Sequence, residues 1–186
     1  MTEQVQRYFR EVASEWDSLR QSLFGEDTRA AVLARADPQP WMRAADIGCG
    51  TGFLALGLAP LVAEVLCVDA SPEMLAQAQS RLHVYPNVRF HVADGAQLPL
   101  ETAGLDLVVA NMYLHHVPEP LLALGEMARV LRPGGQLVLS DMDEHQETWM
   151  RAEMADVWLG FPRDMLAGWL AQAGLCNVSV DSPGHT

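Results

Sequence analysis

The seven residues from position 46 to position 52 combine a carboxylate with three glycines and read Asp-Ile-Gly-Cys-Gly-Thr-Gly. Gly48, Gly50 and Gly52 follow a short apolar run and precede a helical pattern. Because glycine has no Cβ, the chain can turn tightly there and a ligand can lie against bare backbone. A glycine-rich loop between a strand and a helix is typical of a site for a nucleotide-type cofactor.

The spacing of the glycines and the leading carboxylate indicate which kind of ligand fits. In the dinucleotide fingerprint the third glycine follows the second by three positions. Here position 53 is Phe, and the third glycine stands at position 52. Asp46 precedes the loop by two residues, and a carboxylate there disfavours a pyrophosphate but suits a cation. The loop therefore favours a ligand with a cationic group over a dinucleotide.

Two further carboxylates stand at the ends of predicted strands. Asp69 follows Gly50 by 19 residues. A carboxylate in that position can accept two hydrogen bonds from a ribose diol, in an NAD or in an S-adenosyl ligand. Asp94 ends the next strand and could accept a hydrogen bond from an adenine amino group. Asp69 could also be a solvated aspartate at a strand end, but the glycine loop at the right distance favours its binding role.

These residues must be positioned by a regular scaffold. Helical patterns dominate residues 1–40, and strand and helix patterns alternate over residues 41–181. Such alternation predicts one domain, residues 1–186, with a parallel sheet covered by helices on both faces. One amphipathic helix is expected from Val5 to Leu23, and another helical stretch from His145 to Leu159. The expected strands are Met42–Ile47, Val65–Val68, Val88–Val92, Leu105–Ala110, Gln136–Asp141 and Asn177–Val180.

Five motifs in order indicate a family. They are Asp46–Gly52, Val68–Met74, Ala93–Gly95, Leu105–Val109 and Leu131–Gly135. In order and spacing they resemble the motifs of class I S-adenosylmethionine-dependent methyltransferases, and the resemblance covers about residues 5 to 181. It implies a Rossmann-like, doubly wound α/β fold with a mainly parallel sheet of six or seven strands and an N-terminal lid helix.

The resemblance also implies a role for each motif residue. Gly48, Cys49 and Gly50 would line the methionine part of S-adenosyl-L-methionine, with Asp46 near its ammonium group. Asp69 would bind the ribose. The other implied cofactor-binding residues are Ala70 and Met74 beside the adenine, Asp94 and Gly95 at its amino group, and Asn111 beside the methyl donor. S-adenosyl-L-homocysteine would be the product.

The two ends of the chain resemble particular groups within this family. Residues 9–17, Phe-Arg-Glu-Val-Ala followed by Trp16 and Asp17, resemble the cofactor lid of small-molecule methyltransferases, including quinone-biosynthesis enzymes. Tyr8, Phe9 and Trp16 are lid candidates, and simple core packing is the alternative for each. The segments 141–145, 149–151 and 158–161 resemble the methyltransferase domain often joined to ArsR-type metal-responsive repressors, here without a winged-helix part.

The histidine pair at positions 115 and 116 follows the fourth predicted strand, where the family places residues that face the substrate. Either His115 or His116 could be a general base, because imidazole titrates near neutral pH. The alternative is that both histidines cap or pack. A metal site built from both histidines and from Asp141, Asp143 and His145 is disfavoured, because adjacent histidines are not a recognised ligand spacing. We therefore expect no metal.

Composition excludes several other classes of function. The formal net charge is −12, and all twelve basic residues are arginine, so a broad basic face for nucleic acid is not expected. The segment Asn111-Met112-Tyr113-Leu114 lacks the proline pair of DNA amino-methyltransferases. Three scattered cysteines fit buried thiols in a reducing cytoplasm, and neither a secretory signal nor a membrane span is expected. The chain stops at Thr186, without room for a seventh strand, which would leave a sheet edge available for homodimerisation.

The sequence thus predicts a cytoplasmic S-adenosylmethionine-dependent methyltransferase with a small-molecule acceptor. Two alternatives stay open: a non-catalytic S-adenosyl binder that acts as a sensor or partner subunit, and an NAD-dependent oxidoreductase on the same fold. One chain gives no code for the acceptor itself.

Overall fold

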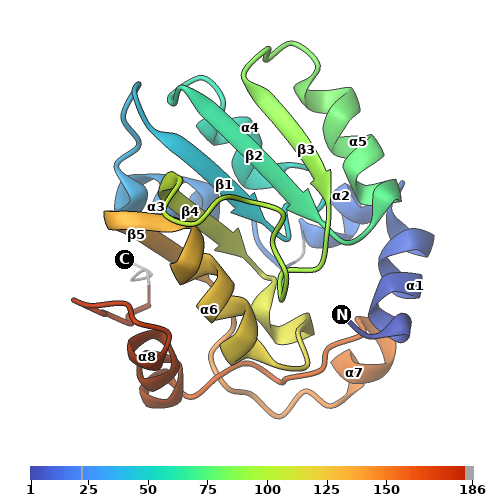
Figure 1. Ribbon diagram of the computed structural model, residues 1–186. Coiled ribbons are helices and arrows are strands. Elements are labelled where there is room, and N and C mark those ends of the chain that lie inside the picture. Colours follow the sequence, from blue (N-terminus) through green and yellow to red (C-terminus); the bar gives the residue numbers. More distant parts are fainter. Residues whose placement is uncertain (22, 183–186) are drawn as a thin grey trace.

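The computed structural model describes residues 1–21 and 23–182, and a five-stranded sheet lies at its centre (Figure 1). All neighbouring strands are parallel. In spatial order the strands are β3 (Val88–Val92), β2 (Glu64–Asp69), β1 (Arg43–Ile47), β4 (Leu105–Asn111) and β5 (Leu131–Ser140). Five of the six predicted strands are confirmed, although β5 begins at Leu131 and not at the predicted Gln136. The predicted total of six or seven is wrong, because the sheet of the described residues has five strands.

The inner strands are almost continuously apolar because both faces of the sheet are covered. Figure 1 shows α3 (Glu26–Ala36) and α4 (Phe53–Leu58) behind the sheet and α6 (Pro120–Val130) in front of it. Helix α5 (Pro72–Leu82) shares the core of α3 and α4, whereas α8 (Arg163–Gln172) shares that of α6. Successive residues of β1 alternate between these cores: Ala44 belongs to the first and Ala45 to the second. This is the pattern of a parallel strand buried on both sides.

The segment Asn177–Val180 was predicted as a sixth strand and does not form one. Asn177 has a φ of 56°, which interrupts an extended chain at its first residue. The valines of the segment, Val178 and Val180, instead pack against the core that contains α6. Nη2 of Arg35 in α3 donates to both carboxylate oxygens of Asp181, at 3.0 and 2.8 Å. The expectation of homodimerisation through the open edge stays a prediction.

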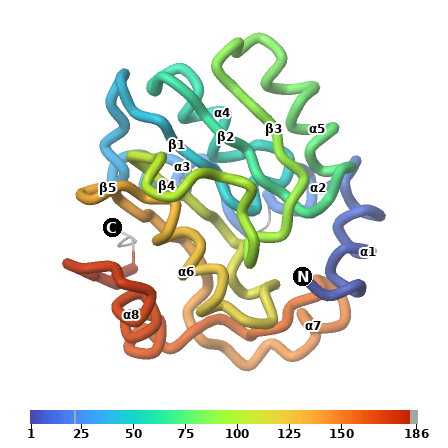
Figure 2. Tube along the Cα trace, viewed as in Figure 1, coloured from blue at the N-terminus to red at the C-terminus, as the bar shows by residue number. Residues whose placement is uncertain are grey.

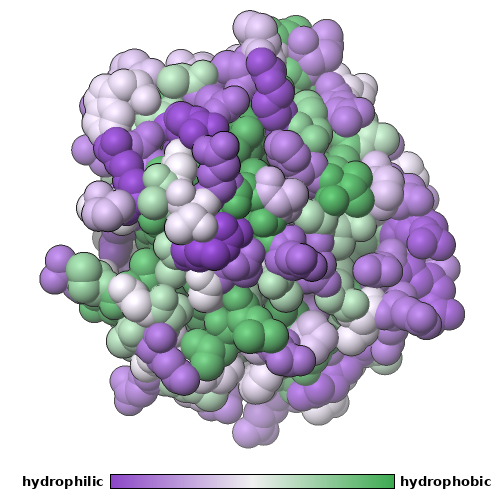
Figure 3. All heavy atoms as spheres, in the orientation of Figure 1, coloured by the Kyte–Doolittle hydropathy of each residue, from purple (hydrophilic) through white to green (hydrophobic). Residues whose placement is uncertain are grey.

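The helical N-terminal region is divided where one helix was predicted. Helix α1 (Glu3–Val12) begins at a Thr2 cap, and α2 (Trp16–Arg20) follows after a turn. In that turn the amide of Glu15 donates to the carbonyl of Val12 at 2.9 Å. The turn lets Phe9 of α1 and Trp16 of α2 face each other, with ring centroids 5.3 Å apart. The outward side of α1 is hydrophilic (Figure 3, right-hand side).

The predicted helix from His145 to Leu159 is mostly irregular. Only α7 (Trp149–Glu153) is helical within it. Residues before and after α7 are joined by backbone hydrogen bonds, from His145 to the carbonyl of Leu159 and from Phe161 to that of Met142. These bonds close residues 142–161 into a loop, which the tube in Figure 2 shows running below α6 and past α1. No helix among the described residues is long and apolar enough to cross a membrane.

Candidate functional site

The carboxyl ends of the parallel strands meet at one edge of the sheet, and the motif residues gather there. Ile47 pairs with Val68, and Asp69 pairs with Val92 on the neighbouring strand. On the other side, Asn111 at the end of β4 pairs with Ser140. Ligands of open α/β sheets bind at this edge, so the topology brings the predicted residues to one place.

The glycine loop after β1 is held in its turn by hydrogen bonds to β2. The amides of Gly48 and Cys49 both donate to the carbonyl of Val68, at 2.8 and 3.1 Å. Gly48 has a φ of 67°, a conformation that side-chain-bearing residues rarely adopt. A Cβ at Gly48 would also lie 2.1 Å from the ring of Tyr113. The first glycine of the motif is therefore required by its backbone conformation and by a close neighbour.

Asp69 connects the glycine loop to the start of α5. Its Oδ2 accepts the amide of Gly50 at 2.8 Å, and its Oδ1 accepts that of Ser71 at 2.9 Å. Burial raises the pKa of Asp69, although these backbone donors oppose the shift. The carboxylate thus fixes the loop and still lines the cavity with its remaining acceptor capacity.

Asp46 lies in β1 beneath the loop, and its side chain is buried. Its Oδ2 accepts the amide of Ala55 in α4 at 2.9 Å. Burial raises the pKa of Asp46 to about 7, opposed by this hydrogen bond and assisted by the charge of Asp69. A carboxylate held in this way gains most from a cationic partner, because such a partner would favour its charged form.

Asp94 and Gly95 form the third part of the edge. Asp94 accepts the amide of Ala96 at 3.0 Å and pairs with the N-terminal ammonium of Met1. Burial raises the pKa of Asp94, but the hydrogen bonds from that ammonium and from Ala96 outweigh it and the pKa is lowered. The predicted adenine end therefore carries a charged carboxylate.

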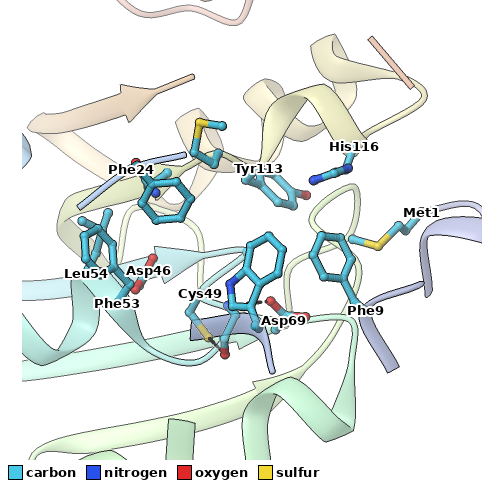
Figure 4. Close-up of a pocket in the computed structure, with 15 residues that line it drawn as sticks. Met1, Phe9, Phe24, Asp46, Cys49, Phe53, Leu54, Asp69, Tyr113 and His116 are labelled. Atoms are coloured by element: carbon cyan, nitrogen blue, oxygen red, sulfur yellow. Dashed lines mark hydrogen bonds between the residues drawn. The ribbon is translucent and has the colours of Figure 1, made fainter. Parts of the chain in front are cut away.

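A cavity at this edge measures about 50 Å³ and is lined in part by aromatic rings. Phe9 reaches it from α1, whereas Tyr113 and His116 come from the segment after β4 (Figure 4). Six of the predicted cofactor residues line it: Asp46, Gly48, Cys49, Gly50, Asp69 and Asn111. The other four, Ala70, Met74, Asp94 and Gly95, do not line it. Met74 instead packs against Ala13 and Trp16.

Sequence reasoning missed Tyr113, which is 4% exposed and lies across the edge of the sheet. Its ring lies against Gly48, and a Cβ built on Gly95 would come within 1.9 Å of its hydroxyl oxygen. Tyr113 thus fills the space between the two loops. The available signal was an aromatic residue two positions after Asn111, at the end of β4.

The two predicted catalytic histidines lie on η1 (Leu114–His116) and differ in position. His116 lines the cavity and packs edge-on against Phe9, with centroids 4.8 Å apart. His115 lies behind it and donates from Nδ1 to Asp141 at 2.7 Å. Burial lowers the pKa of His115, but Asp141 more than reverses this and the pKa is raised. Burial and the charge of His115 hold the pKa of His116 well below its usual range.

Asn111 supplies an independent sign of a ligand. Its Oδ1 is buried and has no hydrogen-bond partner among the described residues. Buried carbonyl oxygens are normally paired. An acceptor of this kind beside Asp46 and the glycine loop fits a ligand that carries an N–H donor, such as the amino-acid end of S-adenosylmethionine.

Comparison with known proteins agrees with this geometry. Residues 45–139, just over half of the chain, match the family described as "Methyltransferase domain". A demethylmenaquinone methyltransferase of Staphylococcus aureus is 34% identical over 142 residues, which cover 73% of this chain and 59% of that protein. An uncharacterized 37.1 kDa protein in transposon Tn4556 of Streptomyces fradiae is 38% identical over 118 residues, which cover 62% of this chain and 34% of that protein. The chain thus spans about a third to three fifths of these relatives.

A solved structure shares the fold. Phosphoethanolamine N-methyltransferase 2 of Haemonchus contortus, in complex with S-adenosyl-L-methionine, superposes with a TM-score of 0.74 at 23% identity. The match covers 86% of this chain and 39% of that one. With the family match over residues 45–139, the ordered motifs and the sheet edge that gathers them, the chain belongs to the class I S-adenosylmethionine-dependent methyltransferases.

Proposed function

We propose that this protein transfers a methyl group from S-adenosylmethionine to a small-molecule acceptor. The observation that carries the proposal is the glycine loop, which Asp69 holds at the edge of a cavity lined in part by aromatic rings. Two similar proteins with named activities support the acceptor class, because their names refer to demethylmenaquinone and phosphoethanolamine, which are both small molecules.

The proposed cofactor roles follow the contacts of each residue. Gly48, Cys49 and Gly50 would present bare backbone to the methionine part, and Asp46 would compensate its ammonium group. Asp69 would bind the ribose with the acceptor capacity that its two backbone donors leave. Asp94 and Gly95, with Ala70 and Met74, would form the adenine end once Tyr113 moves away from Gly95.

The chemistry needs little from the protein beyond placement. The acceptor atom forms a bond to the methyl carbon as the carbon–sulfur bond breaks, and S-adenosylhomocysteine leaves with the electron pair. The sulfonium already activates the methyl group, so orientation and exclusion of water are the main contributions of the chain. Phe9 and Trp16 provide that enclosure. Proton removal by His115 or His116 stays a prediction, and only His116 of the two lines the cavity.

The cofactor assignment is tested by calorimetric titration with S-adenosylhomocysteine. Asp69→Asn keeps the size of the side chain but removes its charge, and the affinity should fall about tenfold to a hundredfold, as for hydrogen bonds to a charged group. Asp164→Asn, which changes an exposed carboxylate on α8, is the matched control and should bind like wild type. Equal affinity in wild type and Asp69→Asn would contradict the assignment.

Activity is tested separately from binding. Wild type incubated with methyl-labelled S-adenosylmethionine and a panel of quinols, phenols and amines should label at least one acceptor. Binding without transfer over the whole panel would favour the sensor alternative. A rise in melting temperature with NADH instead of S-adenosylhomocysteine would favour the oxidoreductase.

A further inference from the structure

Two histidines and two aspartates form a buried cluster behind the cofactor cavity. His115 and His116 lie on η1, Asp141 follows β5, and Asp156 lies in the loop after α7. Single ligand atoms of His115, His116 and Asp156 all lie within 4.8 Å of one another. Imidazole nitrogens and a carboxylate oxygen are the donors that Zn²⁺ and similar cations use in proteins.

Asp156 is the unusual member of this cluster. Its side chain is 1% exposed, and within residues 1–21 and 23–182 neither carboxylate oxygen has a hydrogen-bond partner. The ring nitrogens of the two histidines lie close to it: its Oδ1 is 3.7 Å from Nε2 of His115 and 3.8 Å from Nδ1 of His116. A buried carboxylate without hydrogen bonds is costly, and such groups are normally paired or coordinate a metal.

We propose that His115 Nε2, His116 Nδ1 and an oxygen of Asp156 bind one divalent transition-metal ion of the Zn²⁺ class. Ligand atoms at the usual zinc distances are separated by about 3.4 Å in tetrahedral geometry. The two distances to Asp156 exceed this value by only a few tenths of an ångström. Nitrogen donors make Mg²⁺ and Ca²⁺ poor occupants, because both prefer oxygen ligands.

The surrounding contacts orient the ligands as a metal site requires. Asp141 accepts from Nδ1 of His115 and thereby leaves Nε2 free for the ion, as in carboxylate–histidine–metal triads. The amides of Val157 and Trp158 donate to the carbonyl of His115 at 3.0 and 2.9 Å. These two bonds fix the loop that carries Asp156 against η1.

Two neighbours complete the surroundings. The carbonyl oxygen of Ala155 lies 3.4 Å from Nδ1 of His116, so it could serve as a fourth ligand after that nitrogen loses its proton. Nε2 of His145 is buried without a hydrogen-bond partner in the described part of the chain, and His145 acts electrostatically on Asp156. A hollow of about 340 Å³ lies on the surface between the start of α1 and the loop after α7, and Asp156 is among the residues that line it.

The sequence alone led us to expect no metal. Adjacent histidines were disfavoured because they are not a recognised ligand spacing. Here different nitrogens are used, Nε2 of His115 and Nδ1 of His116, and the rings lie with centroids 4.0 Å apart. Asp156, the third ligand, is 40 residues further along the chain and carried no motif.

Calorimetric titration of untagged, chelator-treated protein with Zn²⁺ tests the site, and Co²⁺ absorption reports its ligand geometry. Wild type should bind one equivalent with a dissociation constant of micromolar or lower, and Mg²⁺ should give no heat. Asp156→Asn should weaken Zn²⁺ binding by at least a hundredfold, and Asp141→Asn by about tenfold to a hundredfold. His83→Gln, which changes an exposed histidine, is the control and should bind like wild type.

A second readout keeps the test decisive. Zn²⁺ should raise the melting temperature of wild type and not that of Asp156→Asn, which should itself be no less stable than wild type without metal. If Asp156→Asn does not fold, His116→Gln replaces it in both measurements. Absence of stoichiometric binding, or equal binding in wild type and Asp156→Asn, would overturn the proposal. So would a loss of binding in Cys176→Ser alone, which would assign the ion to that exposed thiol.

Discussion

Tyr113 lies against two glycines that belong to different loops, Gly48 after β1 and Gly95 after β3. Gly95, unlike Gly48, has no positive φ, so alanine is compatible with its backbone. The Cβ of Gly95→Ala would nevertheless lie 1.9 Å from the hydroxyl oxygen of Tyr113. We expect this substitution to destabilise the cofactor-free protein by about 1–3 kcal/mol, as overpacking does. Urea unfolding measures the change.

A double-mutant cycle identifies the cause. In a Tyr113→Ala background the ring is absent, so Gly95→Ala should cost less than about 0.5 kcal/mol. An equal cost in both backgrounds would show that Gly95 is needed for another reason. Such a result would contradict the position of Tyr113 between the two loops.

Asp46 makes the stability of the cofactor-free protein depend on pH. Its pKa is raised from 3.8 to about 7, so the folded state holds its proton more tightly than the unfolded state. The contribution of Asp46 to the free energy of unfolding is therefore fully present below about pH 4 and is lost as the pH rises toward 7. Three pKa units correspond to about 4 kcal/mol, which is an upper limit.

Asp46→Asn removes this dependence and keeps an acceptor for Ala55. The free energy of unfolding of the variant, relative to wild type, should increase by about 1–4 kcal/mol between pH 4.5 and pH 8. Denaturant titrations at the two pH values measure it. A difference between the proteins that does not change with pH would contradict a raised pKa.

At the level of residues, the sequence predicted groups whose role depends on a local position and missed groups whose role depends on distant partners. Asp46 and Asp69 lie at the cavity as predicted, because a strand end and a glycine loop fix where a carboxylate lies, and their roles in cofactor binding stay predictions. Tyr113 and Asp156 were not found, because the first is defined by Gly95 and the second by a histidine pair 40 residues earlier. Neither relation leaves a periodic signal in the chain.

The helices and strands were also predicted correctly where local patterns determine them and incorrectly where distant contacts do. Strands β1 to β4 were predicted within one or two residues. The inner strands β1, β2 and β4 are largely apolar because both of their faces are buried, whereas the edge strand β3 alternates apolar residues with Arg89 and His91. The bounds of the N-terminal helices and the loop around α7 were not predicted correctly, because amphipathic spacing continues across a turn such as that between Val12 and Trp16. Hydrogen bonds to distant residues, such as Trp158 to His115, determine where such segments bend.

Asp17 of α2 connects the N-terminal helices to the rest of the site. Its carboxylate accepts from Thr51 in the glycine loop at 3.0 Å, and it pairs with Arg20 and with Arg81 of α5. Asp17→Asn should weaken this connection and increase the dissociation rate of S-adenosylhomocysteine about tenfold, with a smaller effect on association. Stopped-flow displacement measures both rates.

Glu11→Gln is the matched control for Asp17→Asn, because Glu11 is an exposed acid of α1. It should leave both rates within about twofold of wild type. If Asp17→Asn changes only the association rate, the carboxylate does not hold the lid closed, and the N-terminal helices would have to be retained by their aromatic contacts alone.

The whole molecule is strongly acidic, with 24 acidic residues against 12 arginines. Ion pairs occupy many of the arginines, including Arg35, Arg43 and Arg163, so much of the negative charge is left without a partner of opposite sign. Excess charge of one sign destabilises a compact state, and salt screens it. Raising NaCl from 20 to 200 mM should stabilise the protein by about 1 kcal/mol, or 2–4 °C in melting temperature.

Scanning calorimetry at constant pH shows whether added salt raises or lowers the melting temperature. A melting temperature that falls with salt would mean that the surface ion pairs outweigh the repulsion. Sucrose at matched osmolality serves as the control, because it adds no ions and should act through exclusion alone.

The contact of Tyr113 with the two glycine loops has a kinetic consequence for the whole protein. Because the cavity measures only about 50 Å³ and Tyr113 lies against both loops, we expect cofactor to bind only those molecules in which the ring and the N-terminal helices have moved. The apparent dissociation constant is then the intrinsic value divided by the fraction of such molecules. If one molecule in about a hundred is open, affinity is reduced by about 2.7 kcal/mol. The observed association rate then levels off at high cofactor concentration, at the rate with which the protein itself opens.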